Sequence, residues 1–123
     1  MPEKALFIYA VTTLLPIRDS GSWAAFKKGW PLSPRLMDYF YDAYCPDKEA
    51  RYGASPLEQL SLIPPTLLIT AADDILADQQ TEFARRFNAQ QLIYEGAGHI
   101  FLSRAEGAAF RQRALADAAA FLA

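Results

Sequence analysis

Asp74 and the only histidine of the chain, His99, are the two residues best suited to chemistry. Asp74 follows an apolar run over residues 65–72, and His99 follows a second run over residues 91–95 and a glycine-rich turn. Such runs are typical of buried strands, and sites in open α/β sheets form at the carboxyl ends of strands. A carboxylate that holds an imidazole makes up two members of a Ser-His-Asp triad for acyl transfer. We therefore predict that the two side chains meet at one edge of adjacent strands.

The third member of a triad, the serine nucleophile, is not evident in the sequence. It normally lies on a sharp strand-to-helix turn of the form Gly-x-Ser-x-Gly, and neither this motif nor a His-Gly-Gly oxyanion segment occurs. The serines are Ser20, Ser22, Ser33, Ser55, Ser61 and Ser103. Three of them, at 33, 55 and 103, precede helix patterns and are expected to cap helices. The sequence thus predicts the acid and the base of a triad without its nucleophile.

Structural interpretations stay open for both residues. Asp74 could bond backbone amides in a turn, and a lone histidine beside apolar residues is more often packed in a core than catalytic. Asp73 is the neighbouring carboxylate that could be mistaken for the acid. Asp78 is placed to begin a helix, where the helix dipole favours a negative charge.

Strand and helix patterns alternate along the chain, which predicts an α/β fold of about three parallel strands flanked by helices. The first expected strand begins at Ala5 and ends at Thr12, and the others cover residues 66–71 and 91–94. Helices are expected between Pro34 and Pro46, briefly after Ser55, over residues 78–88, and after a Ser-x-x-Glu capping box at residues 103–106. In the first of these helices, Leu36, Phe40 and Tyr44 recur at the spacing of one apolar face, with Met37 and Tyr41 beside them.

Two segments of the chain resemble the hormone-sensitive-lipase-like carboxylesterases, the α/β-hydrolase fold-3 group. Residues 64–78, PPTLLITAADDILAD, are similar to that family's PPT-strand-A-x-x-D-x-L-x-D segment, and residues 94–101, YEGAGHIF, are similar to its Y-x-G-x-x-H-x-F segment. The likeness runs over nearly the whole chain but covers only the C-terminal portion of the family. Ile75 stands where the family commonly has Pro or Ala, and Ile100 stands where it often has Gly.

This resemblance implies a partial α/β-hydrolase fold and hydrolysis of short-chain carboxylic esters, with Asp74 orienting His99. It also implies that residues 17–50 form a cap-like segment within a single domain, 1–123. Trp23, Trp30 and Ile100 are the expected substrate-binding residues. For the two tryptophans, an ordinary place in the core fits the sequence equally well.

Composition and charge exclude several classes of function. The formal net charge is −2 without a block of like charges, which argues against a nucleic-acid ligand. One histidine and one cysteine, Cys45, are too few for a zinc site or an internal disulfide, so we expect no metal, no cofactor and a cytoplasmic location. The apolar run that follows Lys4 is too short to span a bilayer. A hydrophobic content of 52% suggests that some apolar surface meets a partner.

The strand from Ala5 to Thr12 is the expected place for such a partner. In the family it would pair with the strand that precedes the nucleophile, and without that neighbour it is an apolar sheet edge. We expect either a homodimer or pairing with a complementing chain through this edge. Three hypotheses stay open: a chain that is inactive alone and active with a serine-bearing partner, a non-catalytic interaction or dimerisation module, and a fragment with no role of its own.

Overall fold

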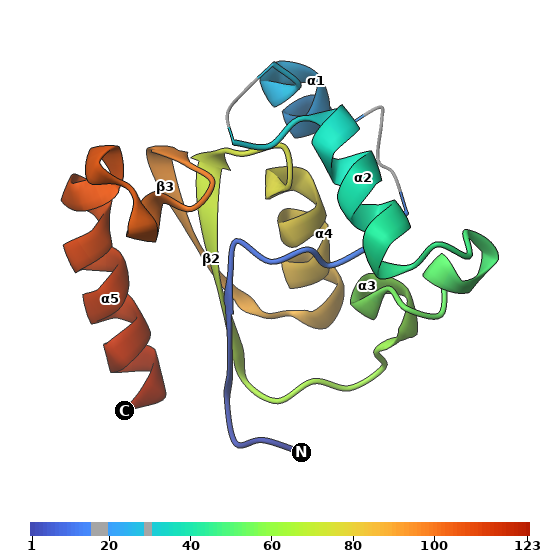
Figure 1. Ribbon diagram of the computed structural model, residues 1–123. Coiled ribbons are helices and arrows are strands. Elements are labelled where there is room, and N and C mark those ends of the chain that lie inside the picture. The colour runs from blue at the N-terminus through green and yellow to red at the C-terminus, as the bar shows by residue number, and fades with distance from the viewer. Residues whose placement is uncertain (16–19, 29–30) are drawn as a thin grey trace.

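A three-stranded parallel sheet forms the centre of the computed structural model, which describes residues 1–15, 20–28 and 31–123 (Figure 1). The strands are β1 (Ala5–Ile8), β2 (Thr66–Asp73) and β3 (Gln90–Gly98). Their spatial order is β1-β2-β3, and both pairings are parallel. The predicted α/β fold with three parallel strands is confirmed. β2 is buried along most of its length because it has a neighbour on each side.

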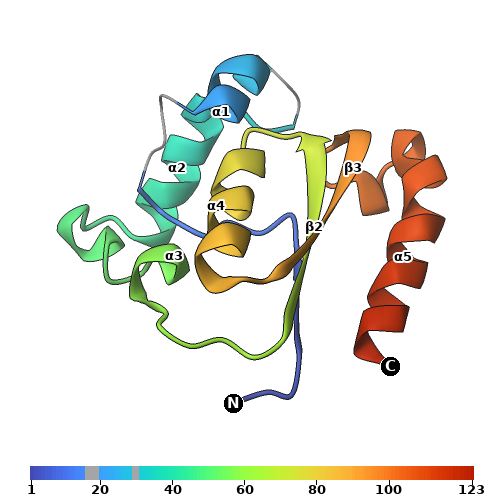
Figure 2. The ribbon, with the colours of Figure 1, turned by 180° about the vertical axis from the view of Figure 1, so that it is seen from behind.

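Helices cover both faces of this sheet. They are α1 (Gly21–Phe26), α2 (Pro34–Tyr44), α3 (Pro56–Gln59), α4 (Ala77–Phe87) and α5 (Ala108–Leu122), with short 3₁₀ turns η1 (Glu49–Arg51), η2 (Phe101–Ser103) and η3 (Ala105–Gly107). Figures 1 and 2 show α4 and α5 on opposite sides of the sheet, with α1 near the carboxyl ends of the strands. None of the helices in the described parts of the chain is long and apolar enough to cross a membrane.

The core has three clusters that follow this layering. One cluster lies between the sheet and α5 and includes Ile69 and Phe101, while a second lies between the sheet, α3 and α4 and includes Leu68 and Phe83. The third packs α1 and α2 onto the segment after β2, where Leu76 is 1% exposed. The segment that holds α1 and α2 therefore has a core of its own above the strand ends that carry Asp74 and His99.

The first strand is shorter than its sequence predicts, because it ends at Ile8 and not at Thr12. The amides of Thr12 and Thr13 donate to Oε1 of Gln79 on α4, at 2.6 and 3.1 Å, so they are not available to a sheet. Thr12 Oγ1 adds a bond to the Gln79 carbonyl at 3.0 Å. Figure 1 shows the chain leaving β1 and crossing toward α2. The apolar residues that predicted the strand therefore continue beyond its end at Ile8.

The buried face of α2 is only part of the predicted apolar face. Met37 and Tyr41 are buried, as expected, at 2% and 1% exposure, whereas Phe40 and Tyr44 are 44% and 74% exposed. The buried part is the side of α2 that packs on the cluster containing Leu76. With Tyr39, which is 66% exposed, three aromatic side chains of α2 face solvent.

Helix starts are predicted correctly at Ser33 and wrongly at Ser103. Ser33 Oγ accepts from the Leu36 amide at 3.2 Å, as expected of an N-cap. Ser103 instead ends η2, and α5 begins at Ala108 after a second 3₁₀ turn. Glu106 bonds Arg104 and so does not close the expected capping box. Gly107 permits this compact path, because a Cβ on it would collide with the Phe101 backbone.

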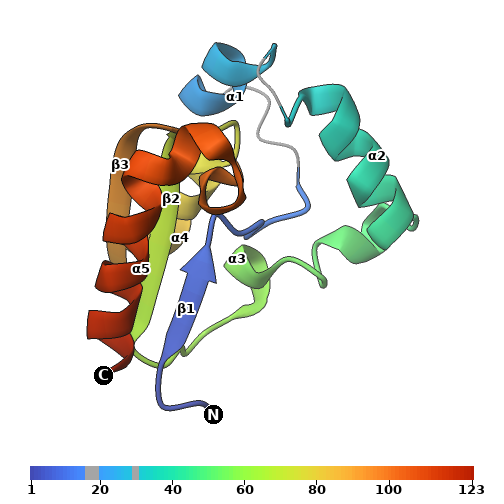
Figure 3. The ribbon, with the colours of Figure 1, turned by 60° about the vertical axis from the view of Figure 1, so that its left-hand side comes forward.

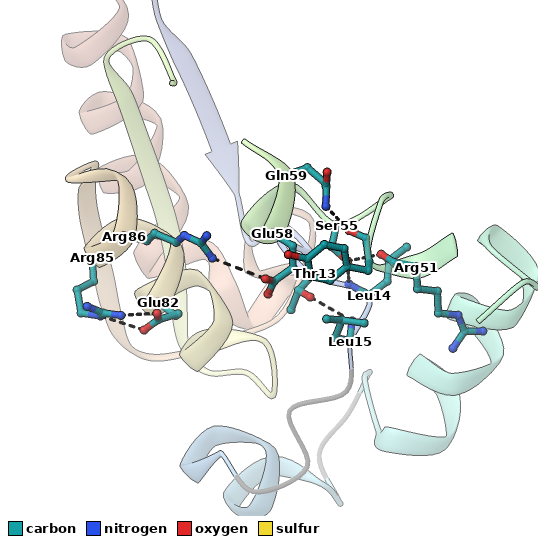
Figure 4. Close-up of polar contacts among 11 residues, drawn as sticks. Thr13, Leu14, Leu15, Arg51, Ser55, Glu58, Gln59, Glu82, Arg85 and Arg86 are labelled. Carbon is teal, nitrogen blue, oxygen red and sulfur yellow. Dashed lines mark hydrogen bonds and ion pairs between the residues drawn. The ribbon is translucent and has the colours of Figure 1, made fainter. Parts of the chain in front are cut away.

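Ser55 lies at the start of α3, as expected, but its hydroxyl serves a different contact. It donates to the Arg51 carbonyl at 2.7 Å and accepts from the Leu14 amide at 2.8 Å, and it does not cap the helix (Figure 4). Figure 4 also shows Arg86 of α4 reaching Glu58 of α3, a 3.7 Å ion pair between the two helices. The Ser55 bond to Leu14 thus fixes α3 against the segment after β1, and the ion pair fixes α3 against α4.

Candidate active site

The sheet register brings Asp74 and His99 to the same edge. β2 and β3 pair regularly from Leu67 opposite Gln90 to Ala71 opposite Tyr94, and an irregularity then places Asp73 opposite Gly98. Asp74 and His99 are the next residues of the two parallel strands. The positive φ of Gly96, 83°, lies within this irregularity and is a conformation that glycine adopts without strain.

The two side chains form a direct hydrogen bond. His99 Nδ1 lies 2.6 Å from Asp74 Oδ2, and the Asp74 side chain is fully buried while that of His99 is 16% exposed. The other carboxylate oxygen, Oδ1, accepts from the Leu76 amide at 2.9 Å. Both oxygens of Asp74 are thus bonded, so the carboxylate has a fixed orientation toward the imidazole. One oxygen thus makes the bond expected of a turn residue, and the other makes the contact expected of a triad acid.

This contact decides the chemistry of the imidazole. A carboxylate only accepts hydrogen bonds, so the short contact assigns the proton of the neutral ring to Nδ1. Nε2 then carries the lone pair and can act as a base. Within residues 1–15, 20–28 and 31–123, no donor forms a hydrogen bond to Nε2. A carboxylate-oriented histidine whose Nε2 can accept a proton is the arrangement that general acid–base catalysis requires.

A cavity of about 530 Å³ lies beside this histidine. Its wall is mainly apolar and consists of Tyr9, Val11, Thr13, Leu14, Leu32, Met37, Phe40, Tyr41, Tyr44, Ala54, Pro56, Leu76 and His99. Two of the exposed aromatic residues of α2, Phe40 and Tyr44, belong to this wall. A largely apolar cavity with one basic nitrogen at its side is suited to a small ligand that carries an apolar group and a reactive polar group.

Of the expected substrate-binding residues, Trp23 and Ile100 do not lie in the wall of this cavity. Trp23 is 3% exposed and packs in the cluster that joins α1 and α2, so its place is in the core. Ile100 is partly buried in a left-handed conformation, with φ 57°, and it is not a wall residue. Trp30 lies outside the described residues. The substrate roles of these residues stay predictions, and the cavity wall offers other candidates.

Four of the described serines, Ser20, Ser22, Ser33 and Ser55, use their hydroxyls in contacts away from His99. Ser22 Oγ is buried, donates to the Ile75 carbonyl at 3.0 Å and accepts from the Asp78 amide at 3.1 Å. Ser20 Oγ accepts from the Trp23 amide, as an N-cap of α1. Neither of these hydroxyls contacts His99, and the same is true of the other serines in the described parts of the chain.

The neighbouring carboxylates are separate from the pair. Asp73 is exposed and lines a different cavity of about 310 Å³, together with Arg104 and Glu106. Asp78 lies in the first turn of α4, as predicted, and its Oδ2 accepts from the Ser22 amide at 2.9 Å. Asp74 is therefore the carboxylate that the fold selects for His99.

Tyr9 is a site residue that sequence reasoning missed. Its ring meets the His99 ring edge-on, with centroids 4.8 Å apart and an interplanar angle of 60°. The signal available in the sequence was its position at the end of the first strand, on the same sheet edge as Asp74 and His99. The assignment of a strand continuing to Thr12 hid that position.

With the fold and the pair established, the comparisons with known proteins identify the class. A family model described as alpha/beta hydrolase fold matches residues 1–103. The chain therefore belongs to the alpha/beta hydrolase fold family, and within it the chain is carboxylesterase-like. No curated protein matches the chain at a significant level.

Solved esterase structures superpose on most of the chain. Carboxyl esterase 2 of the mycorrhizal fungus Tuber melanosporum has a TM-score of 0.75 at 25% identity, with 91% of this chain and 45% of that chain covered. The Pyrobaculum calidifontis esterase has a TM-score of 0.78 at 25% identity, with 96% of this chain and 42% of that chain covered. A thermostable esterase from Pseudomonas putida has a TM-score of 0.72 at 30% identity, with 89% of this chain and 40% of that chain covered. This chain thus spans less than half the length of these esterases.

Proposed function

We propose that this chain supplies the acid–base pair of a carboxylic ester hydrolase, and that the nucleophilic serine comes from a polypeptide that docks along β1. The observation that carries the proposal is the 2.6 Å contact between the buried Asp74 carboxylate and His99 Nδ1, beside an apolar cavity. The carboxylesterase-like family of the chain supports it.

The chemistry follows the roles of the two residues. The docked serine would transfer its proton to His99 Nε2 as its oxygen bonds the acyl carbon of the ester. His99 would return that proton to the departing alcohol, and water would then release the acid by the same two steps. Asp74 holds the ring and stabilises the imidazolium in each step. The apolar part of a short-chain ester would occupy the cavity beside Leu14 and Met37.

Hydrolysis of nitrophenyl acetate, with and without a serine-directed phosphonate, tests the proposal. The chain alone is expected to give no turnover that the phosphonate blocks. Adding a polypeptide that carries the serine elbow, such as the matching part of the Pyrobaculum calidifontis esterase, is expected to give blocked turnover. Phosphonate-sensitive turnover by this chain alone would contradict the proposal, because the nucleophile would then lie within it.

The outer edge of β1 is where that polypeptide would bind. Within the residues that the structure describes, β1 pairs only with β2, and Figure 3 shows it at the near edge of the sheet. On the side of β2, the Ala5 amide donates to the Pro65 carbonyl at 2.9 Å, and the Tyr9 amide donates to the Ile69 carbonyl at 2.7 Å. Amides alternate along a strand, so those of Leu6 and Ile8 face the open side. Two unpaired donors on an apolar strand favour the addition of another strand.

The same open edge favours a second candidate, a non-catalytic dimerisation module. Its residues, ALFI, carry no charge that would discourage pairing, whereas β3 has Gln90, Gln91 and Glu95 on the opposite edge of the sheet. Without a complementing polypeptide, β1 would pair with β1 of a second copy around a two-fold axis. A dimer without ester turnover in any complemented mixture would favour this module over the hydrolase.

Replacing Leu6 with proline tests the pairing of the edge. The Leu6 amide faces away from β2, so proline removes a donor to the partner without removing a bond within the sheet. In a two-fold dimer two bonds are lost, and the dissociation constant is expected to rise by about tenfold or more. Sedimentation or light scattering at micromolar concentration measures the dissociation constant of the dimer.

Leu6→Ala is the matched control for this experiment. It removes the same partly buried side chain from the α5 cluster but keeps the amide, so it isolates the effect of the donor. Equal association of the two variants, or a monomeric unmodified chain, would argue against pairing through β1.

A further inference from the structure

The backbone at Tyr9 has an unusual conformation. Its φ is 35°, in the left-handed region that side chains other than glycine rarely adopt. Its amide still donates to the Ile69 carbonyl at 2.7 Å, so the residue remains attached to the end of β2. Strain of this kind persists only where the surrounding structure maintains it, and it occurs often at functional sites.

The strained backbone changes the side of the sheet that Tyr9 faces. Side chains alternate along β1, so Leu6 and Ile8 pack toward α5 while Phe7 packs toward α4. Regular alternation would direct Tyr9 to the same side as Phe7. Tyr9 instead packs with Ile8 against the α5 cluster. The left-handed turn therefore places the Tyr9 ring on the side of the sheet where His99 lies.

The ring of Tyr9 there contacts the residues that surround the base. Its centroid is 4.8 Å from that of His99 and 5.9 Å from that of Phe101, both in edge-on arrangements. Tyr9 and His99 also share the wall of the 530 Å³ cavity. The bond to Asp74 fixes His99 only at Nδ1, and one hydrogen bond leaves the ring free to rotate about that contact. A second contact on the ring removes this freedom.

We propose that Tyr9 is a positioning residue for His99: its ring, turned toward the site by the left-handed backbone, holds the imidazole in the plane that bonds Asp74 and directs Nε2 to the cavity. The role of Tyr9 in ester hydrolysis rests on the proposed function. Its effect on the geometry of His99 does not, because all the residues concerned belong to this chain.

Nuclear magnetic resonance of the ¹⁵N-labelled chain tests the proposal directly. His99 is the only histidine, so its Nδ1 proton gives one signal without assignment by mutagenesis. A proton bonded to a buried carboxylate resonates far downfield and exchanges slowly with water. Tyr9→Phe retains the ring and is expected to preserve this signal. Tyr9→Leu removes the ring contact and is expected to raise the exchange rate about tenfold, the effect of losing one aromatic pair.

Tyr9→Gly gives a second test if the leucine variant does not fold. Glycine accepts the left-handed backbone without strain, so the fold is maintained while the ring is lost. It is also expected to lose the slowly exchanging signal. Circular dichroism verifies the fold of each variant. A wild-type signal and exchange rate in folded Tyr9→Leu or Tyr9→Gly would overturn the proposal. That result would leave the hydrolase proposal standing, because the resonance experiment does not measure ester turnover.

Discussion

Asp74→Asn is expected to lower the turnover of the complemented hydrolase by about 10⁴-fold. Asparagine retains an oxygen that can accept from the Leu76 amide, so the turn after β2 is preserved. Its amide group, however, would face His99 Nδ1 as a donor and force the ring proton onto Nε2. The nitrogen required as a base would then hold a proton. Initial rates with nitrophenyl acetate measure this effect, and the downfield Nδ1 signal should disappear in the chain alone.

Asp73→Asn is the matched control for this variant. Asp73 is the adjacent residue, is exposed, and its side chain lines a different cavity from the one beside His99. Its turnover is expected to stay within about twofold of that of the unmodified protein, as for most surface substitutions. If the two asparagine variants lose turnover to the same extent, or if Asp74→Asn retains it, Asp74 is not the triad acid.

Phe83→Ala is expected to lower the free energy of unfolding by about 3–5 kcal/mol. Phe83 is fully buried between α4 and the sheet, and its ring lies 5.4 Å from Phe7 and 4.6 Å from Phe87. Truncation would leave a void among residues of α3, α4 and two strands. Domains of this size have about 5–15 kcal/mol of stability in total, so the loss is a large part of it. Urea denaturation followed by circular dichroism measures the change.

Tyr52→Ala provides the comparison for that experiment. Tyr52 has a similar aromatic side chain that is 55% exposed, so its removal creates no buried void. The change is expected to be about 0.5 kcal/mol or less. Equal losses for the two variants would mean that the cluster around Phe83 does not stabilise the sheet.

The contact between Asp74 and His99 could be predicted from the sequence because it depends mainly on the order of the strands. Two apolar runs separated by one helix pattern indicate adjacent parallel strands, and the residues that follow them then lie at one edge. Residues 66–73 and 90–98 form these strands, close to the predicted ranges. The helix predicted over residues 78–88 also forms, as α4 (Ala77–Phe87), with Phe83 buried and Arg85 exposed.

The surroundings of the pair depend on contacts that no local pattern contains. β1 ends early because Gln79, more than 60 residues away, bonds the amides of Thr12 and Thr13. Trp23 lies in the core because α1 and α2 pack on Leu76, whereas its loop-like sequence also allowed a place in the substrate pocket. The late start of α5 depends on the close approach of Gly107 to the Phe101 backbone.

The bond between Asp74 and His99 joins residues only 25 positions apart, within the single unit β2–α4–β3. Closing a loop of that length carries a small entropic cost, so this unit can align the carboxylate and the imidazole early in folding. The hydrogen bond itself therefore needs no residue from outside this unit, whereas the plane of the imidazole also depends on Tyr9 in the proposal above. Under the proposed function, the acid and the base are encoded together in one short stretch of sequence.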